Sequence, residues 1–257
     1  MDLGLKNKVA LVTGGSRGLG RYCALALARE GANVAICART QDNLSKTVAE
    51  MKAFGGQAAG LVADVTNPQD APRVHAEVVR LLGPVDILVN NVGGGKGGEF
   101  SETTEEHLKE SFDLNVFGSF RLIKLVAPHM QQQKWGRIIN IASIWGREYG
   151  GRLAYMTGKS ALIAFTKHLS RSLAKDGVLV NSVAPGSTDF PGGSWERFQK
   201  QNPPDVVKEF VKNELPMGQF GKPEPIADLV AFLASERAST ISGSCIVVDA
   251  GQSRALF

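Results

Sequence analysis

The chain has 257 residues, 43% of them apolar and 21% charged, and carries a formal net charge of +4. Its length allows one large α/β domain or two small ones, and its composition is ordinary for a soluble globular protein. The lysines and arginines form no dense block, so we expect no nucleic-acid partner. No apolar stretch reaches transmembrane length and no signal peptide precedes the first strand, so we expect a cytoplasmic protein without a membrane partner. Three cysteines inside apolar runs are expected to be buried free thiols: Cys23, Cys37 and Cys245.

Short apolar runs alternate with longer segments of helical periodicity. The runs occupy residues 9–12, 34–38, 61–63, 87–89, 137–141, 178–183 and 245–248. A helix is expected from Arg21 to Glu30, closed by Gly31, and another toward Phe54. Nearly continuous apolar runs indicate strands buried on both faces, which predicts an α/β fold: a doubly wound, Rossmann-type sheet of about seven parallel strands flanked by helices. We expect one domain over residues 1–257, with ligands at the carboxyl ends of the strands.

A glycine-rich turn follows the first expected strand and opens the first helix. Such a turn directs backbone N–H groups and a helix N-terminus toward a pyrophosphate. Its spacing is Gly-x-x-x-Gly-x-Gly, one residue longer than the usual dinucleotide fingerprint. The expected cofactor-binding residues here are Gly14, Ser16, Arg17, Gly18, Leu19 and Gly20.

The end of the second strand indicates which dinucleotide is bound. An NAD enzyme usually places Asp or Glu there for the ribose 2′-hydroxyl. This chain has Arg39 instead, and an arginine pairs with a 2′-phosphate, with Arg17 able to assist. The alternative is that Arg39 is only a solvated charge at the start of a helix. We expect NADP(H) rather than NAD(H).

Further cofactor contacts are expected after the third and fourth strands. Asp64 and Val65 are placed to bracket the adenine, although Asp64 fits a turn or capping role equally well. Asn91 and Gly93 end the fourth strand, where the chain must approach the cofactor closely. The glycine-rich stretch 93–98 contains Lys96 and is expected to be mobile.

A tyrosine and a lysine one helical turn apart, Tyr155 and Lys159, follow Ser143 at a strand end. Tyr155 is expected to exchange a proton with a carbonyl or alcohol oxygen, and Ser143 to hydrogen-bond the same oxygen. Lys159 is expected to lower the pKa of Tyr155 and to hold the nicotinamide ribose. Asn115, in a helical segment, is either a structural hydrogen-bonding group or the anchor of a water that relays protons to Lys159.

These motifs resemble the short-chain dehydrogenase/reductase family over essentially the whole chain, in the style of the 3-oxoacyl-carrier-protein reductases. The resemblance implies that Pro185, Gly186 and Thr188 lie against the nicotinamide, and that the protein is a homotetramer or homodimer. It also implies Asn115, Ser143, Tyr155 and Lys159 as the catalytic residues.

Three positions depart from the family pattern. Val92 replaces a small residue, and Asp249-Ala250-Gly251 replaces the usual Asp-Gly-Gly. Asp176 stands where carrier-protein reductases tend to have Arg, although Lys175 and Lys134 keep positive charge nearby. This weakens the basic rim expected for docking a carrier protein.

Residues 187–223 interrupt the α/β rhythm with prolines and aromatic residues. The segment is either a surface insertion or a small helical lid over the substrate, and we favour the lid. Aromatic side chains predict a largely apolar substrate pocket formed by Trp145, Tyr149, Phe190 and Trp195, with further aromatics at Phe198 and Phe210. Arg197 or Lys96 is a candidate for an anionic part of the substrate. The four histidines are scattered without ligand partners, so no metal is expected.

The sequence therefore predicts an NADP(H)-dependent oxidoreductase that interconverts a small-molecule ketone, 3-oxoacyl or hydrophobic, and a secondary alcohol. Alternatives are an NAD-dependent dehydrogenase of sugars, polyols or other alcohols, and a dinucleotide-binding regulator without catalysis. An epimerase or dehydratase with the same Tyr-Lys pair usually has a longer carboxyl-terminal region than 257 residues allow.

Overall fold

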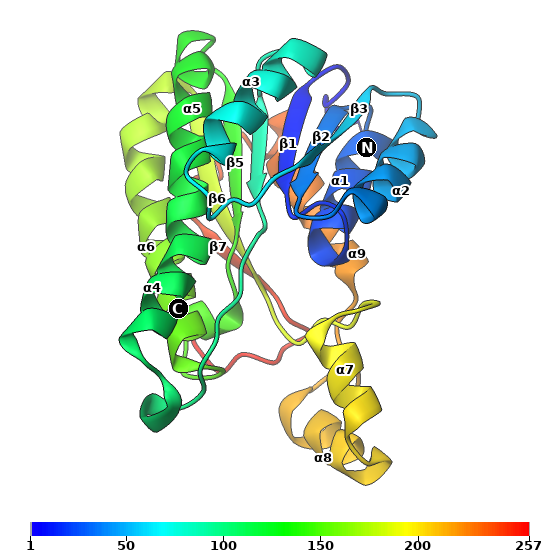
Figure 1. Cartoon of the computed structure of the whole chain (residues 1–257), viewed down its shortest axis with the longest axis vertical. Coiled ribbons are helices and arrows are strands. Elements are labelled where there is room, and N and C mark those ends of the chain that lie inside the picture. Colours follow the sequence, from blue (N-terminus) through cyan, green and yellow to red (C-terminus); the bar gives the residue numbers. More distant parts are fainter. Residues whose placement is uncertain (1, 257) are drawn as a thin grey trace.

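A single sheet of seven parallel strands forms the centre of the molecule in the computed structural model, which describes residues 2–256 (Figure 1). The strands lie in the order β3-β2-β1-β4-β5-β6-β7, so the order reverses at β1. Each predicted apolar run contributes to one strand. Their bounds are β1 Val9–Thr13, β2 Asn33–Ala38, β3 Ala58–Val62, β4 Ile87–Asn90, β5 Gly136–Ile141, β6 Val178–Pro185 and β7 Cys245–Val248. The predicted doubly wound fold is confirmed.

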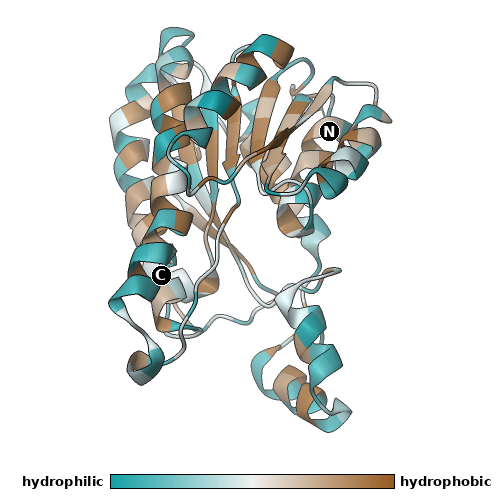
Figure 2. Ribbon diagram, in the orientation of Figure 1, coloured by the Kyte–Doolittle hydropathy of each residue, from teal (hydrophilic) through white to brown (hydrophobic). Residues whose placement is uncertain are grey.

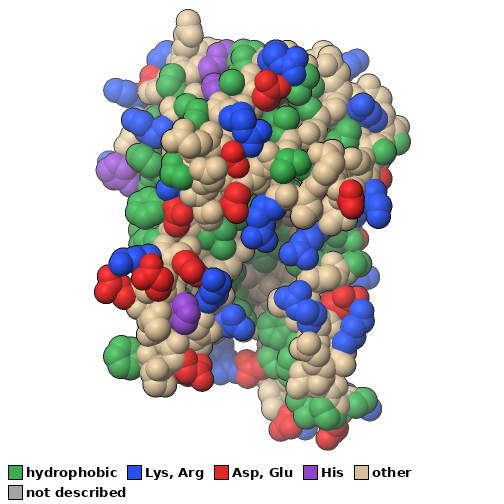
Figure 3. Space-filling model, viewed as in Figure 1, with side chains coloured by type: hydrophobic (Ala, Val, Ile, Leu, Met, Phe, Trp, Pro, Cys, Tyr) green, Lys and Arg blue, Asp and Glu red, His purple; other side chains and the backbone are tan. Residues whose placement is uncertain are grey.

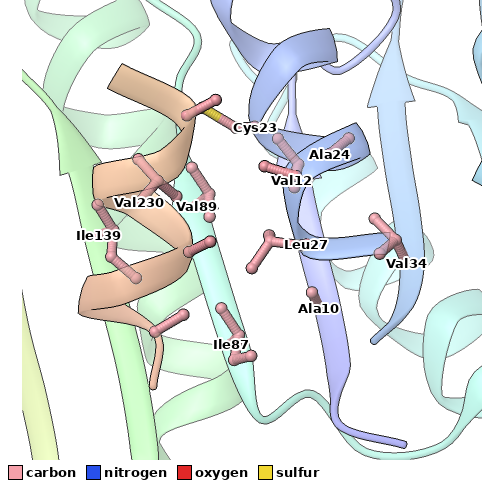
Figure 4. Packing of buried hydrophobic residues seen from close by; sticks show 14 of the residues in the cluster. Ala10, Val12, Cys23, Ala24, Leu27, Val34, Ile87, Val89, Ile139 and Val230 are labelled. Atoms are coloured by element: carbon pink, nitrogen blue, oxygen red, sulfur yellow. The ribbon is translucent and has the colours of Figure 1, made fainter. Parts of the chain in front are cut away.

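Helices cover both faces of the sheet because successive residues of a strand point to opposite sides. From β1, Ala10 and Val12 face one layer, whereas Val9 and Leu11 face the other. The first layer contains α1 (Gly18–Arg29), α2 (Gln41–Lys52) and α9 (Pro223–Leu233). The second contains α3 (Asp70–Leu82), α5 (Gly118–Gln132) and α6 (Leu153–Leu173). Figure 4 shows the first layer, where Leu27 of α1 and Val230 of α9 pack over the sheet.

Hydropathy follows this layering. The strands are almost uniformly hydrophobic, whereas the helices are hydrophilic on the surfaces turned away from the sheet (Figure 2). Shorter elements complete the body: the helix α4 (Glu105–Phe112), a π-helical turn η2 (Asp113–Phe117), and the 3₁₀ turns η1 (Phe100–Glu102), η3 (Ile144–Gly146), η4 (Ala174–Asp176) and η5 (Glu236–Ala238). None of the helices in the described part of the chain combines the length and apolarity needed to cross a bilayer.

Residues 187–223 form a helical hairpin that stands away from the rest of the molecule (Figure 1). Its helices are α7 (Ser194–Gln201) and α8 (Pro204–Glu214), and neither contains a fully buried residue. Four aromatic rings hold the hairpin together, with centroid separations of 4.9–5.9 Å: Trp195, Phe198, Phe210 and Phe220. A parallel bridge between Thr188 and Gly221 closes its base. We call residues 187–223 the α7–α8 hairpin.

The cysteines differ in their surroundings. Cys23 and Cys37 are fully buried as free thiols, and burial raises the pKa of each to about 12. The expectation of a buried Cys245 is wrong, because this residue lies on the edge strand β7 and is only half-buried.

Candidate active site

The glycine-rich turn is fitted tightly between β1 and α1. Helix α1 begins at Gly18, three residues earlier than predicted. A Cβ atom at Gly20 would lie 2.4 Å from the Gly14 carbonyl oxygen and 2.5 Å from Asn91 Nδ2, so only glycine fits there. Asn91 Nδ2 donates a hydrogen bond to the Thr13 carbonyl oxygen (2.9 Å), and the Asn91 backbone N–H donates to Thr13 Oγ1 (2.9 Å). The turn after β1 is therefore locked to the end of β4.

A cavity of about 1300 Å³ opens at the carboxyl ends of the strands, between the body and the α7–α8 hairpin. Figure 3 shows this hollow, with Lys and Arg side chains on both sides of it. Ligand pockets for one drug-sized molecule span roughly 300–1,000 Å³, so this cavity has room for a dinucleotide and a substrate together.

Most of the predicted site residues line this cavity. They are Gly14, Ser16, Arg17, Gly18, Leu19, Arg39, Asp64, Val65, Asn91, Gly93, Ser143, Trp145, Tyr155, Lys159, Pro185, Gly186, Thr188, Phe190 and Trp195. Gly20 is buried within the turn, and Asn115 lies buried behind the wall. Tyr149 is 84% exposed and lies outside the cavity lining, so its expected substrate role finds no support in the structure.

Two arginines mark the end of the cavity near β2. The register of β1 and β2 pairs Thr13 with Cys37, which brings the glycine-rich turn beside Arg39. Arg17 and Arg39 are both exposed, and within residues 2–256 neither forms an ion pair with a carboxylate. Thr40 and Asn43 also line this end. Neither residue was predicted from the sequence, because a polar side chain at the start of a helix is also a common capping residue.

Asp64 is engaged in a local turn. Its Oδ1 atom accepts hydrogen bonds from the backbone N–H (3.0 Å) and the hydroxyl (2.8 Å) of Thr66. Of the two roles left open by the sequence, the turn role is therefore observed directly, while Asp64 and Val65 also line the cavity.

Tyr155 and Ser143 meet on the wall of the cavity. Ser143 follows β5, and its Oγ atom accepts a hydrogen bond from the Trp145 backbone N–H (3.2 Å). Burial raises the pKa of Tyr155, and a hydrogen bond with Ser143 acts in the opposite direction. The net shift is opposite to the lowered pKa expected from the sequence. The phenol therefore stays protonated at neutral pH, the form needed to donate a proton.

Lys159 is buried one helical turn after Tyr155. Its Nζ atom donates a hydrogen bond to the Ile141 carbonyl oxygen (2.7 Å) and lies 5.7 Å from the centroid of the Tyr155 ring. Burial lowers the pKa of Lys159 to about 7, which explains why it supplies little positive charge to the phenol. A Cβ atom at Gly93 would lie 2.4 Å from Nζ, so the glycine keeps the space around the amine open.

Asn115 lies in the π-helical turn η2 rather than in a regular helix. Its Nδ2 atom donates to the carbonyl oxygens of Gly94 and Ser111 (both 2.7 Å), and its Oδ1 atom accepts from the Gly94 N–H (3.2 Å). The side chain thus fixes the glycine-rich segment after β4 to the end of α4. Single π-helical turns often occur at functional sites.

Trp145 connects the body to the α7–α8 hairpin. Its ring meets Tyr155 edge-on, with centroids 6.4 Å apart and planes at 82°. It also contacts Trp195, with centroids 6.3 Å apart and planes at 49°. Phe190 lies beside Gly18 at the glycine-rich turn, and Phe198 lines the cavity, whereas Phe210 belongs to the interior of the hairpin.

The two basic residues proposed for an anionic substrate have different surroundings. Lys96 forms an ion pair with Glu110 (2.9 Å), and Arg197 donates a hydrogen bond to the Gly192 carbonyl oxygen (2.9 Å). Asp176 does not border the cavity, because η4 follows the carboxyl end of α6 and Tyr155 lies near its amino end. At about 1.5 Å per residue, the helix separates them by ~30 Å. Our expectation that Asp176 weakens a basic rim of this cavity is therefore wrong.

Comparison with known proteins identifies the family. The family model for short chain dehydrogenases matches residues 8–202. The chain belongs to the short-chain dehydrogenase family. A 3-oxoacyl-[acyl-carrier-protein] reductase of Staphylococcus epidermidis is 38% identical over 249 residues, covering 95% of this chain and 98% of the relative.

Two solved structures of short-chain dehydrogenases illustrate the range of their ligands. L-sorbose reductase from Gluconobacter frateurii, complexed with NADPH and L-sorbose, is 32% identical with a TM-score of 0.93, and the match covers 100% of both chains. A 7α-hydroxysteroid dehydrogenase complexed with NADH and a 7-oxo bile acid is 30% identical with a TM-score of 0.89, covering 100% of this chain and 98% of the other. The family of this chain thus contains both NADPH and NADH enzymes, and both sugar and steroid substrates.

The residues of this short-chain dehydrogenase fit a nicotinamide dinucleotide. The turn from Gly14 to Leu19 lines the cavity wall, and α1 starts there with its N-terminus. The buried hydroxyl of Ser187 has no hydrogen-bond partner among the described residues, although it follows the cavity-lining Gly186. No group of three or more potential metal ligands is found within residues 2–256.

Proposed function

We propose that this protein is an NADP(H)-dependent reductase that interconverts hydrophobic ketones or 3-oxoacyl compounds and secondary alcohols. One observation carries the proposal: Ser143, Tyr155 and Lys159 lie in one cavity, and two arginines without carboxylate partners lie in the same cavity. The first group suits proton transfer at a carbonyl oxygen, and the second suits a phosphate.

The reaction assigns separate roles to the polar side chains. When bound, the nicotinamide supplies the hydride that reaches the carbonyl carbon. Tyr155 donates its hydroxyl proton to the carbonyl oxygen, and its raised pKa keeps that proton in place until then. Ser143 accepts from the Trp145 N–H, which leaves its own hydroxyl proton to donate to the same oxygen. In the oxidative direction, Tyr155 takes the proton back from the alcohol.

Lys159 and Asn115 organise the nicotinamide end of the cavity. The Lys159 amine would hydrogen-bond the ribose of a bound cofactor, and its protonated form would stabilise the negative charge that develops on Tyr155. Asn115 holds the Gly94 backbone in place and thereby keeps the wall opposite the ribose fixed. A water anchored at Asn115 would relay protons to Lys159.

Cofactor selection is assigned to Arg17 and Arg39. Both side chains are free to form charge-assisted hydrogen bonds with a 2′-phosphate, and no acid at the end of β2 competes for a 2′-hydroxyl. Gly14, Ser16, Gly18 and Leu19 line the turn and would contact the pyrophosphate, and Asp64, Val65, Asn91 and Gly93 would contact the adenosine side. Pro185, Gly186 and Thr188 line the nicotinamide side.

The α7–α8 hairpin acts as a lid in this proposal, and its aromatic rings define an apolar substrate pocket with Trp145. The assembly is proposed to be a homotetramer or homodimer. Two phenylalanines at the junction of η2 and α5, Phe117 and Phe120, are 48% and 45% exposed, and exposed apolar clusters of this kind mark protein contacts.

Reduction of a sugar ketone is the second candidate, because the sorbose reductase superimposes over the full length of both chains. NADPH oxidation should be followed with an acetoacetyl thioester, 4-phenyl-2-butanone and L-sorbose, and then with NADH in place of NADPH. We expect NADPH-dependent turnover of the first two ketones. Preference for L-sorbose would favour the sugar enzyme, equal use of NADH would contradict the cofactor assignment, and tight NADPH binding without any turnover would indicate a regulator.

A further inference from the structure

The indole of Trp145 forms the wall of the cavity beside Tyr155, and the loop behind it restricts its movement. A Cβ atom at Gly150 would lie 2.3 Å from Trp145 Cδ1 and Nε1, and one at Gly151 would lie 2.6 Å from Trp145 Cε3. The backbone of both residues has positive φ, +155° and +69°, a conformation that favours glycine. The loop therefore packs closely on the Trp145 ring, and Tyr155 also contacts the ring, with the two planes at 82°. These contacts hold the Trp145 ring in place.

The opposite wall belongs to a part of the molecule that is weakly attached. Trp195 contacts the three phenylalanines of the hairpin interior with centroid separations of 4.9–5.6 Å, so it moves only with the hairpin as a whole. Because α7 and α8 bury no residue completely, little buried apolar surface becomes exposed to water when the hairpin shifts. Figure 1 shows that extended segments connect the hairpin to the body, which is the arrangement of a hinge.

The two indoles lie closer together than a flat group stacked between them would require, and their planes are inclined at 49°. Their centroids lie 6.3 Å apart, whereas a flat group in contact with a ring on each side needs about 3.5 Å per contact, or about 7 Å in total. A flat substituent that stacks between the two indoles must therefore displace Trp195, since Trp145 is held by Gly150 and Gly151.

We propose that Trp145 and Trp195 form an aromatic gate beside Tyr155, which opens by movement of the α7–α8 hairpin and selects ketones that carry a flat apolar substituent. This inference rests on the proposed reductase function and adds the substrate class. A flat ring between the indoles regains the contacts that the indoles lose on separating. A sugar replaces them less well, because hydroxyl groups that face the two rings lose their hydrogen-bond partners.

Circular dichroism tests the gate independently of turnover. The chain contains three tryptophans, and two of them are close enough to give an exciton couplet. Trp145→Phe and Trp195→Phe should each abolish the couplet. Trp135→Phe is the matched control, because Trp135 packs between Lys8 and Arg137, away from the cavity. With NADP⁺ present to prevent turnover, 4-phenyl-2-butanone should reduce the couplet and 2-butanone should not. An unchanged couplet in Trp145→Phe, or no response to the aryl ketone, would overturn the proposal.

Kinetics with the same two ketones test the selection. Trp195→Ala should lower kcat/KM for 4-phenyl-2-butanone about tenfold more than that for 2-butanone, because the small ketone does not reach the gate. Trp195→Phe, which keeps an aromatic wall, should recover most of the loss. Equal losses for both ketones would show that Trp195 only stabilises the hairpin. If the wild type reduces neither ketone, the proposed reductase function fails, while the ligand-induced change in the couplet still decides the gate.

Discussion

The body of the molecule and the α7–α8 hairpin are built in opposite ways. In the body, Ser143 follows the buried strand β5, and Tyr155 and Lys159 lie on α6, which packs against the sheet. Asn91 and Asn115 fix the glycine-rich segments by hydrogen bonds. The hairpin has only its own aromatic interior and a few contacts with the body, of which Trp145–Trp195 is the one nearest to Tyr155. Proton transfer needs atoms held within a fraction of an ångström, whereas substrate choice needs a wall that varies in position. In the proposed reaction, separate regions would meet the two demands.

The largest expected effect lies in the body. Tyr155→Phe removes the proton donor and little volume, so turnover should fall about 10²–10⁴-fold while NADPH affinity stays within a factor of about two. Because the change touches only the oxygen chemistry, the loss should be the same for aryl and small ketones. Stopped-flow turnover and NADPH fluorescence titration measure the two quantities.

Tyr149→Phe is the matched control, since this exposed tyrosine lies outside the cavity lining. Substantial turnover in Tyr155→Phe would place the acid elsewhere. A loss that depends strongly on the ketone would contradict the separation of chemistry from substrate choice.

Lys159 should show that the body sacrifices stability for function. Its folded pKa of about 7 lies below the value of about 10.4 in an unfolded chain, so between these pH values the unfolded chain binds more protons and stability rises with pH. Lys159→Met removes the cost of burying the charge and also loses the hydrogen bond to Ile141. At pH 6.5 we expect a net gain of about 2 kcal/mol, or ~4–8 °C in Tm, together with loss of most activity.

Thermal unfolding at pH 6.5 and pH 9.5 checks the sign of this effect. The advantage of Lys159→Met should shrink at the higher pH, because the wild-type penalty fades as the lysine deprotonates in the unfolded chain. A constant difference between the two pH values, or a less stable variant at pH 6.5, would contradict the lowered pKa.

The order of elements and the chemistry-bearing motifs were predictable because both depend on local pattern. Seven apolar runs identified seven strands, and Tyr155 with Lys159 identified a helix face. The start of β3 was missed because Ala58, Ala59 and Gly60 are too small to form an apolar run.

What could not be predicted depends on tertiary packing. Pro204 and Pro223 look like helix breakers in the sequence, but each lies in the first turn of a helix, where its missing N–H has no cost. The direction of the Lys159 amine toward Ile141 and the outward position of Tyr149 follow from contacts between distant segments. The spacing of residues in the sequence indicates neither the direction of the amine nor the exposure of Tyr149.

Arg39 should affect the cofactor and leave substrate choice unchanged. Arg39→Asp replaces a partner of the 2′-phosphate with a charge that repels it, so the Kd of NADPH should rise about 10–100-fold while that of NADH changes little. Isothermal titration with both cofactors measures this. Lys46→Asp makes nearly the same charge change on an exposed position of α2 outside the cavity lining, and it should leave both affinities unchanged. A wild type that binds NADH as tightly as NADPH would refute the assignment.

The smallest expected effect lies in the segment that touches both regions, the turn at Asp249–Gly251. Asp249 accepts hydrogen bonds from the backbone N–H groups of Gly251 (3.0 Å) and Ser253 (2.6 Å), and Gly251 lies next to Pro216 at the end of the hairpin. Between them Ala250 has φ of +57°, a left-handed conformation that costs an L-residue about 1–2 kcal/mol. Ala250→Gly relieves this strain, although a more flexible unfolded chain takes back about 0.4–1 kcal/mol.

We therefore expect Ala250→Gly to stabilise the protein by about 0.5 kcal/mol, or ~1–2 °C in Tm, without changing kcat/KM for either ketone. Ala255→Gly is the matched control, because Ala255 lies in the same segment without a positive φ and should only lose stability. Differential scanning calorimetry compares the two variants. If both variants are less stable than the wild type, glycine does not relieve the strain at Ala250. A gain in stability accompanied by altered selectivity between aryl and small ketones would mean that this turn sets the position of the hairpin, and that the two regions are coupled through it as well as through Trp145 and Trp195.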